Sequence, residues 1–74
     1  MKPIKKKILE VKLIKVEKSF RAGSTPLYYY NFILEGIDEP LMIQLENPLE
    51  HGLVGRKISY FLNEEYEVSE FEIL

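Results

Sequence analysis

The sequence predicts an all-β fold, a small and strongly curved sheet of five strands. Short segments of alternating apolar and polar residues are separated by Gly, Pro, Asn and Ser, which is typical of strands joined by turns. The alternation slips by one position between Leu13 and Ile14. A second slip separates Val68 from Phe71 near the other end of the chain. A strand with such a slip bends through a bulge, so both terminal strands are expected to curve and to close a barrel between them.

The first strand is predicted at Ile4–Ser19, followed by a turn-rich segment at residues 20–26. The slip divides its apolar side chains into two sets that should face different parts of the core, with Leu9, Val11 and Leu13 before it and Ile14 and Val16 after it. Residues 1–6 also fit a disordered basic start, and the sequence leaves this alternative open.

Three strands with regular alternation follow. The second strand, at Leu27–Glu35, ends at a loop in which Gly36 can take a positive φ. The third and fourth strands are predicted at residues 41–46 and 56–62. The apolar faces of the three strands are expected to form the core: Tyr28, Tyr30, Phe32 and Leu34; Leu41, Ile43 and Leu45; Ile58, Tyr60 and Leu62.

Two connections and a last strand complete the expected fold. Between the third and fourth strands, Asn47 and Pro48 have the residue types of a helix start and Gly52 that of a helix end, so one short helical turn is predicted there. The loop at residues 63–65 then turns the chain into the fifth strand, at Tyr66–Leu74.

Size and composition indicate a single domain over residues 1–74. A domain this small buries only about 60% of its unfolded surface, which leaves little room for a large internal substrate cavity. The chain has no cysteine, and Glu10, Lys12 and Lys15 interrupt the apolar segment behind its basic start. We therefore expect neither a signal peptide nor a membrane-spanning helix. The sequence predicts a soluble, cytoplasmic protein.

The net charge of −2 conceals a strong asymmetry. Residues 1–21 carry eight basic and two acidic side chains, whereas residues 22–74 carry two basic and ten acidic ones. Either a polyanion-binding edge or internal pairing between a basic first strand and an acidic last strand would produce this split. We expect the internal pairing, because opposite charges across strands are common in sheets.

The order of elements resembles the oligonucleotide/oligosaccharide-binding (OB) fold, a small five-stranded barrel. The resemblance covers the whole chain in topology, and the segment Leu53–Tyr60 is similar to the glycine-basic-apolar start of strand four in that fold. The short helical turn departs from it, since this connection is often longer. An SH3-like barrel is the rival topology, but its helical turn lies between the last two strands.

The OB resemblance implies a ligand surface on the outer face of the second and third strands. In this sequence the surface would present Tyr29, Asn31, Ile33, Met42 and Gln44, with Arg21 in one flanking loop and Glu64 and Glu65 in the other. Tyr29 could stack a base, and Tyr29, Ile33 and Met42 together form an apolar patch. The acidic rim argues against strong phosphate binding there.

Sites of other kinds are not expected. His51 is the single histidine of the chain, which has no cysteine, and no acidic residues near it have the spacing of metal ligands. We therefore interpret His51 as capping the helical turn rather than as a metal ligand. The glutamates of the last strand, alternating with apolar residues, fit a solvated face better than an acid/base pair. We therefore expect a non-enzymatic protein that uses no cofactor and no metal.

The sequence supports two hypotheses about function. The first is binding of single-stranded nucleic acid, with Tyr29 stacking a base and the backbone held by Lys12, Lys15, Lys18 and Arg21. The second is a protein interface, through self-association or a partner protein, on Tyr29, Ile33, Met42 and Gln44. They differ in one structural requirement, because the nucleic-acid hypothesis needs the lysines of the first strand beside Tyr29.

Overall fold

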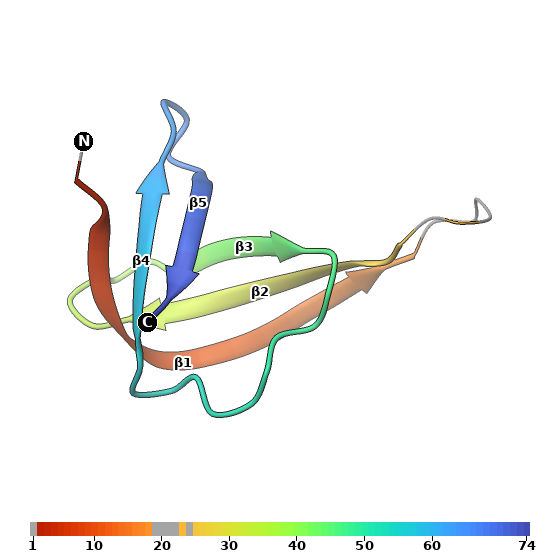
Figure 1. The fold of residues 1–74 in the computed structure, drawn as a ribbon, viewed down its shortest axis with the longest axis horizontal. Coiled ribbons are helices and arrows are strands. Elements are labelled where there is room, and N and C mark those ends of the chain that lie inside the picture. The colour runs from red at the N-terminus through yellow and green to blue at the C-terminus, as the bar shows by residue number, and fades with distance from the viewer. Residues whose placement is uncertain (1, 19–22, 24) are drawn as a thin grey trace.

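The computed structural model describes residues 2–18, 23 and 25–74, and this part of the chain is all-β, as predicted. Five antiparallel strands form one sheet in the order β3-β2-β1-β4-β5 (Figure 1). Their bounds are β1 Ile4–Glu17, β2 Leu27–Leu34, β3 Leu41–Leu45, β4 Lys57–Leu62 and β5 Val68–Ile73.

Strand β1 is bent and belongs to both halves of the sheet (Figure 1). Its first part, Ile4–Lys7, pairs with β4, and the part from Ile8 to Glu17 pairs with β2. Residues 4–6, which the sequence left open between strand and disordered start, are therefore part of the β1–β4 ladder. A basic strand with five lysines is thus held between two neighbours rather than at an edge of the sheet.

The predicted slip at Leu13 and Ile14 is confirmed as a bulge. Leu13 pairs with Tyr30 and Lys15 with Tyr29, which leaves Ile14 without a partner on β2. A second bulge, which the sequence did not predict, leaves Leu9 unpaired between Ile8 and Glu10. The two extra residues increase the local twist and bend of β1.

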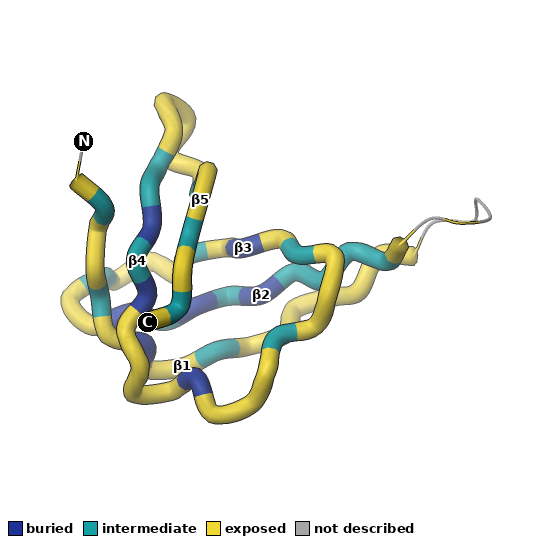
Figure 2. Tube along the Cα trace, in the orientation of Figure 1, coloured by how far each residue is buried: buried dark blue, intermediate teal, exposed yellow. Residues whose placement is uncertain are grey.

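The core lies between the two halves of the sheet and contains the expected faces of β2, β3 and β4 (Figure 2). Its buried residues are Ile8, Tyr30, Phe32, Leu34, Ile43, Leu53, Ile58 and Tyr60. The remaining members of the predicted faces pack against this cluster as half-buried side chains: Tyr28, Leu41, Leu45 and Leu62. Regular alternation therefore predicted the core correctly along these three strands.

Much of β1 lies outside that core. Leu13 is 51% exposed, and Leu9, Ile14 and Val16 are exposed as well, so the expectation that both sets of β1 side chains would pack into a core is wrong. Only Val11 packs against the core cluster as a half-buried residue. The reason is that β4 covers just the first four residues of β1, and the β1–β2 hairpin continues beyond them (Figure 1).

The sheet is not closed into a barrel. In the described residues β3 and β5 share no ladder, although some of their Cα atoms come within 8 Å of each other. The expected closure by the two terminal strands is wrong, because β1 pairs with β4 and β5 pairs only with β4. The structure is a curved five-stranded sheet that is compatible with a small barrel-like fold.

The helical turn predicted at residues 47–52 is absent, and the segment is an irregular loop. Tertiary packing accounts for the difference: Leu49 and Leu53 contact the core, and the backbone N–H of Leu49 donates a 3.0 Å hydrogen bond to the Tyr30 hydroxyl. A helical turn has little intrinsic stability at this length, so these contacts determine the loop conformation. The capping role assigned to His51 is therefore wrong as well.

Replacing Tyr30 with phenylalanine is expected to loosen this loop. The change removes the acceptor of the Leu49 N–H, which is part-buried, so the loss in the free energy of unfolding should reach at most the about 1–3 kcal/mol of a fully buried unsatisfied donor. Urea unfolding measures that loss, and faster amide exchange at Leu49 would locate it. Tyr28→Phe is the matched control, and an equal loss in both variants would contradict the assignment.

The turn before β5 extends further than the sequence suggested. The Asn63 Oδ1 accepts hydrogen bonds from the N–H groups of Glu65 and Glu67, at 2.9 and 3.0 Å. This places Tyr66 in the turn with φ of 62° and 84% exposed, so its prediction as a residue of the fifth strand is wrong. The second predicted slip is confirmed, because a register shift leaves Ser69 without a partner on β4.

Tyr60 gives the fold a predicted pH dependence. Its side chain is 2% exposed, and burial raises the pKa of its hydroxyl above the ordinary value of 10.0. At alkaline pH, unfolding therefore releases the proton of the Tyr60 hydroxyl. The stability that the buried, protonated hydroxyl contributes is complete below pH 10.0, and it is lost as the pH rises through the higher pKa of the folded state. Urea unfolding at pH 8 and pH 11 should show a smaller alkaline loss of stability in Tyr60→Phe than in the unmodified chain. Equal losses would contradict this role of Tyr60.

Candidate ligand surface

Seven of the nine side chains predicted as a ligand surface lie together on the outer face of β1, β2 and β3. We call this set the Tyr29 surface; it consists of Lys12, Lys15, Tyr29, Asn31, Ile33, Met42 and Gln44. The strand register arranges six of these residues in two rows across the sheet, and Ile33 lies beside them opposite Glu10. One row runs from Lys12 through Asn31 to Met42, and the other from Lys15 through Tyr29 to Gln44.

The bulge at Ile14 is what brings both lysines to this face. Side chains alternate along a strand, so without an extra residue Lys12 and Lys15 would point to opposite faces. Because Ile14 is unpaired, Lys15 returns to the outer face opposite Tyr29. The structural requirement of the nucleic-acid hypothesis is met for these two lysines.

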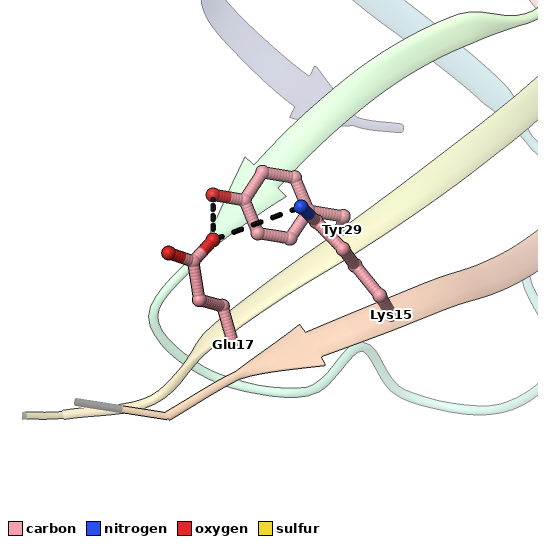
Figure 3. Close-up of polar contacts among 3 residues, drawn as sticks. All are labelled: Lys15, Glu17 and Tyr29. Carbon is pink, nitrogen blue, oxygen red and sulfur yellow. Dashed lines mark hydrogen bonds and ion pairs between the residues drawn. The ribbon is translucent and has the colours of Figure 1, made fainter. Parts of the chain in front are cut away.

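Lys15, Tyr29 and Glu17 form a compact polar group near the end of β1 (Figure 3). The Lys15 Nζ lies 4.5 Å from the centre of the Tyr29 ring, within the range of a cation–π contact. The Tyr29 hydroxyl donates a 2.9 Å hydrogen bond to Glu17 Oε2, and the same oxygen lies 3.8 Å from Lys15 Nζ. The Tyr29 ring is therefore held at its hydroxyl end by Glu17, and the Lys15 ammonium group lies over its face.

The hydrogen bond to Glu17 raises the pKa of Tyr29, with smaller contributions from partial desolvation and from the charge of the same carboxylate. The hydroxyl therefore stays protonated as a hydrogen-bond donor throughout the physiological pH range. A ligand that displaces Glu17 would meet a neutral phenol rather than a phenolate.

Two acidic residues of β1 belong to the surface and were missed by the sequence interpretation. Lys12 Nζ lies 3.9 Å from Glu10 Oε1, and Glu17 contacts Lys15 as described above. Each glutamate stands two residues from its lysine on the same strand, a spacing that places both on one face and could have identified them. All four side chains are more than half exposed, so these pairs contribute little to stability.

The remaining predicted residues are not part of this cluster. Lys18 is exposed just beyond the end of β1, and Arg21 lies outside the described residues. Glu64 and Glu65 are exposed in the β4–β5 turn. The apolar portion of the surface consists of Met42, which is 59% exposed, and the half-buried Tyr29 and Ile33.

No protein-family model, curated protein or solved structure matches this chain. Its function must therefore be inferred from the geometry. Over the ranges that the structure describes, no group of three or more His, Cys, Asp or Glu side chains is placed to hold a metal ion. In the same ranges, no helix has the length and hydrophobicity to cross a bilayer.

Proposed function

We propose that this chain is a non-enzymatic binding module that holds single-stranded nucleic acid on the Tyr29 surface. The strand order supports an OB-like architecture, since a long bent first strand pairs with both the second and the fourth. In OB folds, oligonucleotides lie over strands two and three. The loop at residues 46–56 departs from that pattern because it contains no helix.

The placement of Lys15 next to Tyr29 is the observation that carries the proposal. Single-strand binders combine aromatic rings that stack bases with cations that contact the backbone. Here an exposed lysine lies over the ring and a second lies in the next row, beside Asn31. A base that stacks on Tyr29 would displace the flexible Lys15 side chain, whose ammonium could then contact a phosphate. Asn31 and Gln44 supply amide groups that can pair with base edges.

Chemical-shift mapping with mixed single-stranded oligonucleotides at low salt tests this proposal. The amides of Tyr29, Asn31 and Met42 should shift together, and the affinity should fall as salt is added, because bound lysines release counterions from the phosphates. An absence of shifts at Tyr29, or an affinity that is independent of salt, would overturn it.

A protein interface on the same surface is the second candidate. It is favoured by charge balance, since Glu10 and Glu17 offset Lys12 and Lys15 around an exposed Met42. An apolar centre with a rim of mixed charge is typical of protein interfaces. Association through this surface would depend little on salt, would appear as dimers or complexes in sedimentation, and would be lost in Tyr29→Ser.

A further inference from the structure

A second group of lysines lies where β1 pairs with β4, at the opposite end of β1 from Lys15. Lys5, Lys6, Lys7 and Lys57 line a hollow of about 330 Å³ together with Glu35. We call this site the lysine hollow. Lys5, Lys7 and Lys57 share one face of the β1–β4 ladder, and Glu35 is the one acidic residue of the lining, so the net charge of the hollow is positive, in contrast to the balanced charges around Tyr29.

The register brings two of these lysines directly opposite each other. Lys7 of β1 pairs with Lys57 of β4, and Lys5 pairs with Ser59. Like charges directly opposite across strands are destabilising, and sheets more often place opposite charges there. The arrangement therefore lowers the stability of the ladder in which it stands.

In the part of the chain that the structure describes, no acidic side chain forms an ion pair with a lysine of the hollow. Among the described residues the ion pairs within 4.0 Å are Lys12 with Glu10 and Lys15 with Glu17, and neither involves a lysine of the hollow. Glu35 is held at the margin by its backbone, since its N–H donates a 3.0 Å hydrogen bond to the carbonyl of Lys7. Its carboxylate nevertheless forms no ion pair within that distance.

The backbone around the hollow is well fixed by hydrogen bonds. The N–H of Ile8 donates to the carbonyl of Arg56, and the N–H of Leu74 donates to that of Lys57, both at 2.8 Å. Ile8 and Ile58, the neighbours of Lys7 and Lys57 in their strands, are fully buried. The backbone that carries these lysines is therefore well ordered, while Lys5, Lys7 and Lys57 are themselves exposed to solvent.

We propose that the lysine hollow binds a ligand with clustered phosphate groups. A lysine ammonium contacts phosphate oxygens as a compact point charge with three donors, and several such cations around one hollow match several adjacent phosphates. A bound polyanion would also remove the repulsion between Lys7 and Lys57. The phosphates can come from a free polyphosphate or from a nucleic-acid backbone. The proposal does not depend on base stacking at Tyr29.

Thermal unfolding with sodium tripolyphosphate, at an ionic strength held constant with sodium chloride, tests the site. The ligand should raise the Tm of the unmodified chain, because it binds the folded state. Lys57→Gln should unfold at a higher Tm than the unmodified chain when no ligand is present, since it removes the like-charge pair. The same variant should bind tripolyphosphate about tenfold more weakly, the loss expected for one charged hydrogen bond.

Lys12→Gln is the matched control, because Lys12 is also an exposed lysine of the sheet but lies on the Tyr29 surface beside Glu10. It should bind tripolyphosphate as the unmodified chain does. Equal weakening in Lys12→Gln and Lys57→Gln would show only general attraction to a basic strand and would overturn the proposal. The absence of a Tm increase at constant ionic strength would overturn it as well.

The source of the phosphates is distinguished with Tyr29→Ser. Tripolyphosphate should bind this variant unchanged, whereas loss of tripolyphosphate binding would contradict a separate site. If a single-stranded oligonucleotide shifts the amides of Lys7 and Lys57 in Tyr29→Ser, the hollow binds a nucleic-acid backbone. If only tripolyphosphate does so, the hollow binds free polyphosphates. Neither of these two results depends on whether a base stacks on Tyr29, so they test the hollow separately from the proposed function.

Discussion

Replacing Phe32 with alanine is expected to remove about 3–5 kcal/mol of the free energy of unfolding, the usual cost of truncating a buried aromatic side chain. Phe32 is 0% exposed and lies at the centre of the β2 core face, between Tyr30 and Leu34. A domain of 74 residues has a total stability of about 4–11 kcal/mol, so this single change would leave the chain marginally folded or unfolded. Urea unfolding followed by circular dichroism measures the loss.

Met42→Ala is the control for Phe32→Ala. Met42 lies on the neighbouring strand but faces outward, and its truncation should change stability by no more than about 0.5 kcal/mol. A loss below about 1 kcal/mol in Phe32→Ala, or similar losses in both variants, would contradict the position of the core.

Replacing Tyr29 with serine should weaken single-stranded oligonucleotide binding by about 5- to 150-fold, which corresponds to the 1–3 kcal/mol of one stacked base. The change removes the ring under Lys15 and the hydroxyl bound to Glu17. The ring is half-buried on the outer face, so the fold should persist. Fluorescence anisotropy of a labelled oligonucleotide at fixed salt measures the effect.

Tyr66→Ser serves as the control for Tyr29→Ser. Tyr66 is the most exposed tyrosine of the described chain, but it lies in the β4–β5 turn and not on the Tyr29 surface. Its replacement should leave affinity within about twofold, a surface change of less than 0.5 kcal/mol. Equal weakening in both variants would assign the binding to general aromatic exposure instead.

The regular strands were predictable from sequence because one face of each is buried. In β2, Tyr30, Phe32 and Leu34 alternate without interruption, and the structure buries all three. The bulge at Ile14 was predictable for the same reason, since a change of phase in an apolar pattern requires an unpaired residue. The bulge at Leu9 could not be predicted in this way. Ile8 and Leu9 are adjacent and both apolar, so the pattern does not show which of them is buried.

Other differences arise from contacts that a local pattern does not contain. The hydrogen bond from Leu49 to Tyr30 replaces the predicted helical turn, and the Asn63 side chain extends the turn that contains Tyr66. Leu13 alternates correctly yet remains exposed, because no strand covers that end of the hairpin. In each case an interaction between distant parts of the chain overrides the local propensity.

The two proposed binding surfaces differ in how far the sequence could identify them. The Tyr29 surface follows from alternation along adjacent strands, which predicted Lys12 and Lys15 as outward residues. The lysine hollow depends on Lys7 and Lys57 being partners across strands β1 and β4, a register that no local pattern indicates. Internal pairing of the basic strand with an acidic last strand was expected instead, but β4 lies between β1 and β5.

The double pairing of β1 also has a kinetic consequence. Strands β1, β2 and β3 pair with their neighbours in the sequence, whereas the pairing of Ile4 with Tyr60 joins residues separated by most of the chain. Such long-range pairing carries a larger entropy cost of loop closure, so the β1–β4 ladder is expected to form late in folding. Lys7 and Lys57 approach each other in that step, and ions that screen their repulsion should accelerate it. Added salt is thus expected to favour refolding, in contrast to the proposed nucleic-acid binding, which it should weaken.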